Sequence, residues 1–116
     1  MKALLFLLFL STVIFASPLK TQYEENLLVG IESDNLGLRT SCAYFLGEYK
    51  SDKAIIPLMK MLKSGETEEE RILAANSLAK INSKRGMFAI KQRSKFDESP
   101  RVRHACLLTY NYMLNN

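Results

Sequence analysis

The chain has 116 residues, of which 47% are hydrophobic and 24% are charged, and its formal net charge is +4 at pH 7. This is the composition of a globular protein, and because a chain of this length has room for one domain, a second domain is not expected. Beyond the first apolar segment, nothing approaches the length of a membrane-spanning helix.

The first residues have the order of a secretory signal peptide. Lys2 is followed by an apolar run from Ala3 to Leu10, and small residues then lead to Ala16, as in the charged, hydrophobic and cleavage regions of such a peptide. Because Pro18 disfavours cleavage after Ser17, we expect a signal peptide at residues 1–16 and a mature domain at residues 17–116. An uncleaved anchor is the alternative, although about 14 apolar residues fall short of the roughly 20 that span a bilayer.

Cleavage predicts an exported protein that is soluble in a periplasm or outside the cell. Loss of Lys2 lowers the formal charge from +4 to +3. No cysteine follows the apolar run directly, which disfavours a lipoprotein anchor. Cys42 and Cys106 would lie in a compartment where a disulfide can persist.

Helical spacing of apolar residues begins in the segment from Gln22 to Glu32, which we expect to be the second helix of a truncated first repeat. A longer amphipathic helix is expected after Asn35, a good N-cap residue. Its expected buried face consists of Leu38, Cys42, Phe45, Leu46 and Tyr49. After a break at residues 50–53, capped by Ser51, another helix is expected from about Ala54 to Lys63, with the apolar residues Ile55, Leu58, Met59 and Leu62.

The same order of elements then returns. Thr67 and Glu70 form a capping box, and the helix that follows carries Ala74, Ser77, Leu78 and Ile81 on one face. A break at residues 82–85, capped by Ser83, precedes a helix from about Gly86 to Lys95 with Phe88 and Ile90. Ser99 then caps a last helix from Pro100 to about Met113, with proline at the position where it is tolerated best.

A shift of 32 residues superimposes the chain on itself twice, which indicates an internal repeat. The N-cap residues Asn35, Thr67 and Ser99 obey this period. So do four further columns, namely Arg39, Arg71 and Arg103; Cys42, Ala74 and Cys106; Leu46, Leu78 and Tyr110; and Tyr49, Ile81 and Met113.

The first copy resembles the HEAT-repeat family through Leu38–Tyr49, which contains Arg39 and Leu46-Gly47, and through Ala54-Ile55-Ile56-Pro57-Leu58. Later copies depart from the pattern, since Ala79 replaces Gly47, Ala89 replaces Pro57 and Asn111 holds the third glycine position. The resemblance implies an all-α fold, a right-handed α-solenoid of about three helix-hairpin, HEAT-like repeats with a period of 32. It implies a binding scaffold, but no particular ligand.

The repeat bears on the cysteines and on the arginine column. Cys42 and Cys106 lie two copies apart, on the order of 20 Å at about 10 Å per helix layer, so no disulfide is expected and both are interpreted as small buried hydrophobic residues. Arg39, Arg71 and Arg103 could form an anion-binding ladder, but this position of the repeat commonly pairs with an acidic residue or a carbonyl of the neighbouring copy, and we expect that structural role.

Positive charge gathers in the C-terminal half. Within 24 positions, opposed only by Asp97 and Glu98, the basic residues are Lys80, Lys84, Arg85, Lys91, Arg93, Lys95, Arg101 and Arg103. Export disfavours nucleic acid as the partner, which leaves anionic lipid, an acidic protein, an envelope polymer or a merely solvated face. In a solenoid the second helices line the concave side, and the residues expected there to bind a partner are Lys60, Lys63, Lys91, Gln92 and Lys95.

No catalytic arrangement is visible, since the chain lacks a His paired with Cys or Ser and a glycine-rich phosphate loop. His104, the only histidine, has no metal-site spacing around it. We expect a non-enzymatic adaptor without cofactor or metal that binds a protein of the cell envelope; the alternative is a binder of anionic lipid or envelope polymer. A homo-oligomer through Tyr110, Tyr112 and Met113 is also expected to be possible for so short a stack.

Overall fold

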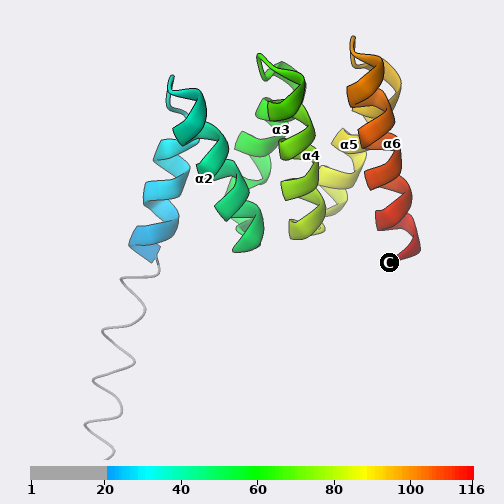
Figure 1. The fold of residues 1–116 in the computed structure, drawn as a ribbon. Helices are drawn as coiled ribbons and strands as arrows, with labels where there is room; N and C mark the ends of the chain where they lie inside the picture. The colour runs from blue at the N-terminus through cyan, green and yellow to red at the C-terminus, as the bar shows by residue number, and fades with distance from the viewer. Residues whose placement is uncertain (1–20) are drawn as a thin grey trace, which may run out of the picture.

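The computed structural model describes residues 21–116, so the expected signal peptide at residues 1–16 lies outside the described residues. Within this range every regular element is helical (Figure 1), which confirms the all-α class. Residues 21–30 form the first helical segment. It is followed by α2 (Leu36–Glu48), the 3-10 turn η1 (Asp52–Ala54), α3 (Ile55–Ser64), α4 (Glu68–Ile81), α5 (Lys84–Phe96) and α6 (Pro100–Asn115). None of the helices in residues 21–116 is long and apolar enough to cross a membrane.

Local capping determines where most of these helices begin. The side chains of Asn35, Ser83 and Ser99 each accept a hydrogen bond from a backbone N–H in the first turn of α2, α5 and α6. Thr67 and Glu70 form both bonds of the expected capping box at α4. The expectation for Ser51 is wrong, because its hydroxyl donates to Glu24 instead and the 3-10 turn η1 leads into α3.

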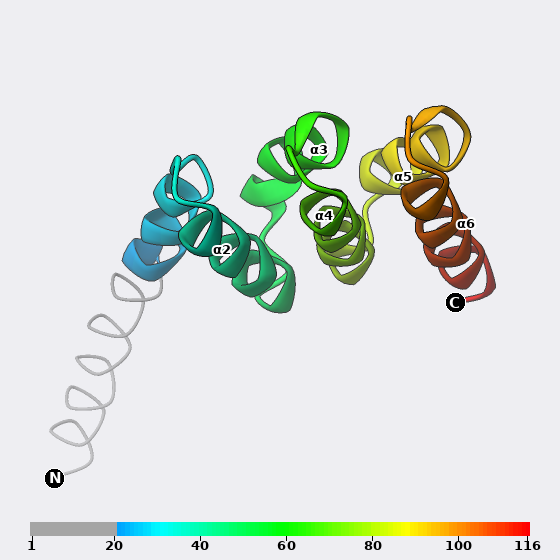
Figure 2. The same ribbon diagram turned by 45° about the horizontal axis from the view of Figure 1, so that its top comes forward.

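The helices lie in two rows (Figures 1 and 2). In the first row α2 contacts α4 and α4 contacts α6; in the second row α3 contacts α5. The rows are held together by the pairs α3 with α4 and α5 with α6, which follow each other in the chain. The segment at residues 21–30 packs beside α2, where the ring centroids of Tyr23 and Tyr49 are 5.2 Å apart.

The core fills the space between the rows. Its largest fully buried apolar side chains are Leu46, Leu58, Leu62, Leu78 and Ile90, and each contributes roughly 2 kcal/mol by leaving water. Within the first row the helices approach closely, because a Cβ atom on Gly47 would lie only 2.8 Å from the Cα atom of Ser77. Glycine is therefore required where α2 meets α4.

Part of the expected buried face of α2 is exposed. Leu38, Phe45 and Tyr49 are 50%, 43% and 49% exposed. One period later the same side of α4 is turned toward α2, and it carries the buried residues Glu70 and Ser77. These positions are buried by the preceding helix of the row, and within residues 21–116 no first-row helix precedes α2. The expectation was wrong because the spacing of residues shows which side chains share a face of a helix, but not whether another helix covers that face.

Candidate interaction surface

Each arginine of the column is bound to backbone close to it in the chain. Arg39, Arg71 and Arg103 each donate through Nη1 to the carbonyl oxygen six residues earlier, at distances of 2.9, 2.8 and 2.6 Å. These carbonyls belong to the loop that leads into each first-row helix, so each guanidinium fastens that loop to its helix.

The first two arginines also reach a carboxylate further along the chain. Arg39 donates to Glu70 on α4 at 2.6 Å, and Arg71 donates to both oxygens of Asp97 at 3.1 and 3.3 Å. Arg103 is different, because the only hydrogen bonds of its side chain within residues 21–116 go to the carbonyl oxygens of Asp97 and Glu98. The column therefore has the expected structural role and is not an anion ladder.

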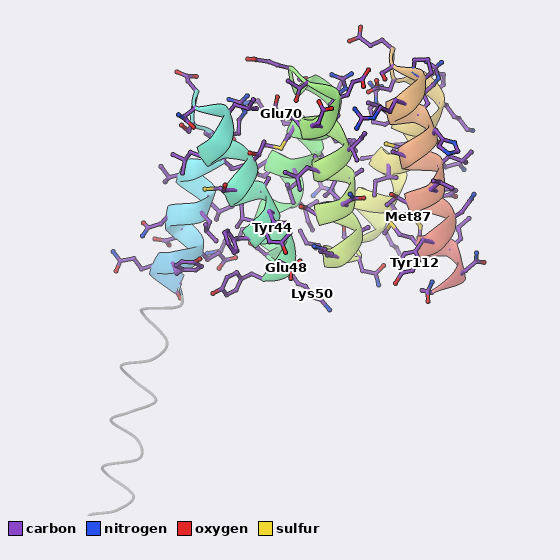
Figure 3. All side chains as sticks on the ribbon, in the orientation of Figure 1. Tyr44, Glu48, Lys50, Glu70, Met87 and Tyr112 are labelled. Atoms are coloured by element: carbon purple, nitrogen blue, oxygen red, sulfur yellow. The ribbon has the colours of Figure 1, made fainter. Side chains whose placement is uncertain are left out.

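Two residues of the basic cluster form ion pairs with a neighbouring helix. Lys80 bonds to Glu48 of α2 and lies 4.6 Å from the centroid of the Tyr44 ring; Tyr44 and Glu48 are labelled in Figure 3. Arg101 pairs with Glu68 and Glu69 of α4. These partners are 32 or 33 residues apart, so residues separated by about one 32-residue period lie side by side on neighbouring helices, and their charges neutralise each other.

Five of the eight basic residues of the cluster lie on α5. Residues Lys84–Phe96 of α5 contain no Asp or Glu. Among the described residues, no ion pair is formed by its basic side chains Lys84, Arg85, Lys91, Arg93 and Lys95. The basic face of the molecule is therefore the surface of α5.

The five residues expected to bind a partner do lie on the second-row helices, with Lys60 and Lys63 on α3 and Lys91, Gln92 and Lys95 on α5. Both lysines of α3 and Lys95 are exposed, whereas Lys91 and Gln92 are half-buried.

These residues contact different neighbours. Lys60 lies 3.3 Å from the Glu32 carboxylate, and the Lys91 ammonium lies 5.7 Å from the centroid of the Tyr110 ring on α6. Lys63 lines a hollow of about 360 Å³ together with Arg93 and Phe96 of α5. The structure thus brings Lys63 next to α5 but does not bring all five residues to one cavity.

Sequence reasoning missed an apolar element of this face. Ile56 on α3 and Phe88 on α5 are 52% and 62% exposed, although Phe88 was expected on the packed side of its helix. They lie 32 residues apart on helices that contact each other. The 32-residue period could have shown that Ile56 and Phe88 occupy equivalent positions. Each is followed seven residues later, on the same side of its helix, by a lysine, Lys63 or Lys95, and a lysine there indicates a solvent-exposed side.

A second hollow lies at the ends of the first-row helices. It has a volume of about 740 Å³ and is lined mainly by α4 and α6, including Lys80, Leu108 and Tyr112. Tyr112, labelled in Figure 3, is exposed. Met113, expected with it as an exposed contact, is buried against the core, so that part of the expectation was wrong.

Both cysteines are free and buried, as expected. Burial raises the pKa of the Cys106 thiol to about 11, which keeps it protonated and unreactive near neutral pH.

No protein-family model matches the chain, and no curated protein sequence matches it.

Proposed function

We propose that the protein is a non-catalytic binding module that holds an acidic segment of a partner protein on the exposed face of α3 and α5, which would be the concave side of the solenoid. In this proposal the two helix rows are about three hairpins of a right-handed, HEAT-like α-solenoid, exported to the periplasm or the cell exterior. The support for the helix arrangement is the 32-residue period of its caps, arginines and ion pairs.

One observation carries the choice of surface. Exposed Ile56 and Phe88 stand beside exposed Lys63 and Lys95 on adjacent helices. Large exposed apolar side chains rimmed by charge are typical of protein interaction sites. Because α5 carries no acidic residue, the complementary partner presents carboxylates around an apolar side chain.

The experiment is capture of envelope proteins by the purified full chain, with two variants in parallel. Phe88→Ser removes the apolar contact, and Lys63→Glu with Lys95→Glu reverses the charge. The matched control reverses two exposed lysines before α3, Lys50→Glu with Lys53→Glu.

A partner retained by the wild type and by the control, but lost by both surface variants, supports this site. We expect added salt to weaken its capture, since the lysines are exposed. Retention by all variants would exclude the α3 and α5 face.

A second candidate is attachment to anionic lipid or an anionic envelope polymer. It is favoured by Phe96, which is 66% exposed on the same basic helix as Phe88. Exposed aromatic residues beside basic ones are typical of helices that lie at a membrane surface.

Vesicles of phosphatidylglycerol and of phosphatidylcholine separate this candidate from the first. Lipid binding predicts co-sedimentation with the anionic vesicles alone, at low salt, and its loss in Phe96→Ser. Absence of co-sedimentation at low salt would remove the candidate.

A further inference from the structure

The side of α6 that faces away from α4 carries exposed apolar residues, one of them at a position that is buried in α2 and α4. Leu107 follows Ala43 and Ala75 at the 32-residue period, and both alanines are buried, whereas Leu107 is 46% exposed. Leu114, two turns further on, is 57% exposed. In α2 and α4 this side packs on the next helix of the row; within the described residues nothing covers it on α6.

The side of α2 that faces away from α4 also carries exposed apolar residues at positions that are buried in the next helix of the row. Leu38 and Phe45 are half exposed, while Glu70 and Ser77 hold the same positions of α4 and are 1% exposed. The two exposed faces are therefore the two sides of a first-row helix that pack against each other inside the row.

The segments next to the two faces differ in charge. Residues 21–38 contain four acidic residues and no Lys or Arg, namely Glu24, Glu25, Glu32 and Asp34. Residues 99–116 contain Arg101 and Arg103 and no acidic residue. Glu32 is paired with Lys60, and Arg101 is paired with Glu68 and Glu69. Asp34, just before α2, and Arg103 on α6 form no ion pair among the described residues, and their unlike charges favour contact between the two faces.

Arg103 identifies one pair within this contact. Its equivalents Arg39 and Arg71 each bond to a carboxylate further along the chain, but within residues 21–116 Arg103 bonds only to carbonyl oxygens. Asp34 is exposed, and it lies two periods before Glu98, whose carboxylate is 3.9 Å from Arg71. Suppose that a second molecule continues the row after α6. Its Asp34 would then lie near Arg103, in the position that Glu98 has relative to Arg71.

We propose that copies of this chain associate head to tail, with the α6 face of one copy, Leu107 and Leu114, packed on the α2 face of the next, Leu38 and Phe45. Arg103 pairs with Asp34 of the second copy. Since Leu107 and Phe45 are larger than the residues at their positions inside the row, the two helices are spaced more widely than α2 and α4. The contact is heterologous, so each added copy leaves one face of each kind open.

The test measures the mass of the full chain by sedimentation over a range of concentrations. Leu107→Glu blocks the α6 face and Phe45→Glu blocks the α2 face, and both replace exposed residues. We expect the wild type to grow with concentration beyond a dimer and each variant alone to remain monomeric. An equimolar mixture of the two variants then forms dimers that grow no further, because it contains one intact pair of faces.

Asp34→Lys tests the ion pair without changing an apolar side chain, and we expect it to weaken association at least tenfold at low salt. Phe88→Ser, on the separate α3 and α5 face, should associate like the wild type, which separates this proposal from the proposed function. A wild-type monomer at every concentration would overturn the proposal, as would a dimer that does not grow. Cross-linking of residues 1–20 to α2 in a monomer would assign that face to the chain's own N-terminal segment and would also overturn it.

Discussion

Glu70 performs two structural tasks with its two carboxylate oxygens. Oε1 accepts a hydrogen bond from Arg39 on α2, and Oε2 accepts one from the backbone N–H of Thr67 at the start of α4. Its side chain is only 1% exposed. Glu70 therefore couples the cap of one first-row helix to the side of another, and an uncompensated change at this residue disturbs both.

This position predicts a specific loss of stability in acid. The hydrogen bond from Arg39 lowers the pKa of Glu70 below its ordinary value of 4.5, against the opposing effect of burial. A carboxylate with a lowered folded-state pKa stabilises the fold above its unfolded pKa, and this contribution is lost as pH falls through the folded-state value. Glu70→Gln should lower the free energy of unfolding by roughly 2 kcal/mol at pH 7 and flatten its decline below pH 4.5, measured by urea unfolding.

Glu69→Gln is the matched control. Its pKa is lowered as well, mainly by the hydrogen bond from Arg101, but Glu69 is exposed and solvent screens the pair. A loss at Glu69 equal to that at Glu70 would show that burial does not set the strength of these pairs.

Ser77 gives a prediction of the opposite sign. Its hydroxyl is buried where α2 and α4 approach, and it has no hydrogen-bond partner among the described residues. Because an unsatisfied buried hydroxyl is unfavourable, Ser77→Ala should raise the free energy of unfolding by about 1 kcal/mol. Ser41→Ala, on the exposed surface of α2, should gain only the difference in helix propensity, a few tenths of a kcal/mol. Destabilisation by Ser77→Ala in thermal unfolding would contradict this account.

At the scale of the element, the arginine column fixes the loops between the rows. Arg71 bonds to both oxygens of Asp97 and to the Gly65 carbonyl, a planar fork that lysine cannot reproduce. Arg71→Lys keeps the positive charge but loses hydrogen bonds of this fork, so it should lower the free energy of unfolding by roughly 2 kcal/mol, the scale for hydrogen bonds to charged groups. Arg103→Lys should cost less in the monomer, because only carbonyl bonds are replaced; equal losses in denaturant unfolding would contradict the distinction.

The elements themselves could be predicted because their signals are local. Asn35, Thr67, Ser83 and Ser99 bond within their own first turns, so residues three positions apart suffice to find them. Ser51 could not be predicted in this way, because Glu24, the partner of its hydroxyl, lies 27 residues away on another helix.

The candidate surface was less predictable because exposure depends on neighbours. The spacing of α2 correctly groups Leu38 and Phe45 on one side, but only the order of helices in the row shows that this side is open. Likewise, the eight basic residues of the C-terminal half look alike in sequence. Glu48, Glu68 and Glu69 neutralise Lys80 and Arg101 across the row, and of the six that remain five lie on α5 and one, Arg103, lies on α6.

At the scale of the whole molecule, the two rows predict a gradient of stability. Among the described elements, α4 shares substantial contacts with α2, α3, α5 and α6, whereas α6 shares them only with α4 and α5. Since each helix is stabilised mainly by those beside it, the stack should open from its ends. Hydrogen exchange should therefore be slowest in α4 and fastest in residues 21–30 and in α6, and equal exchange in all helices would instead indicate a single cooperative unit.

The same measurement distinguishes an end that frays from an end that is covered. If α6 receives the α2 face of another copy, its amide exchange slows as protein concentration rises, and so does that of α2, while α4 changes little. In Leu107→Glu the exchange of α6 should be independent of concentration, because the variant keeps the helix but not the contact. Concentration-dependent slowing in that variant would place the association on another surface of the molecule, because Leu107 is one of the two exposed leucines that form the proposed α6 contact.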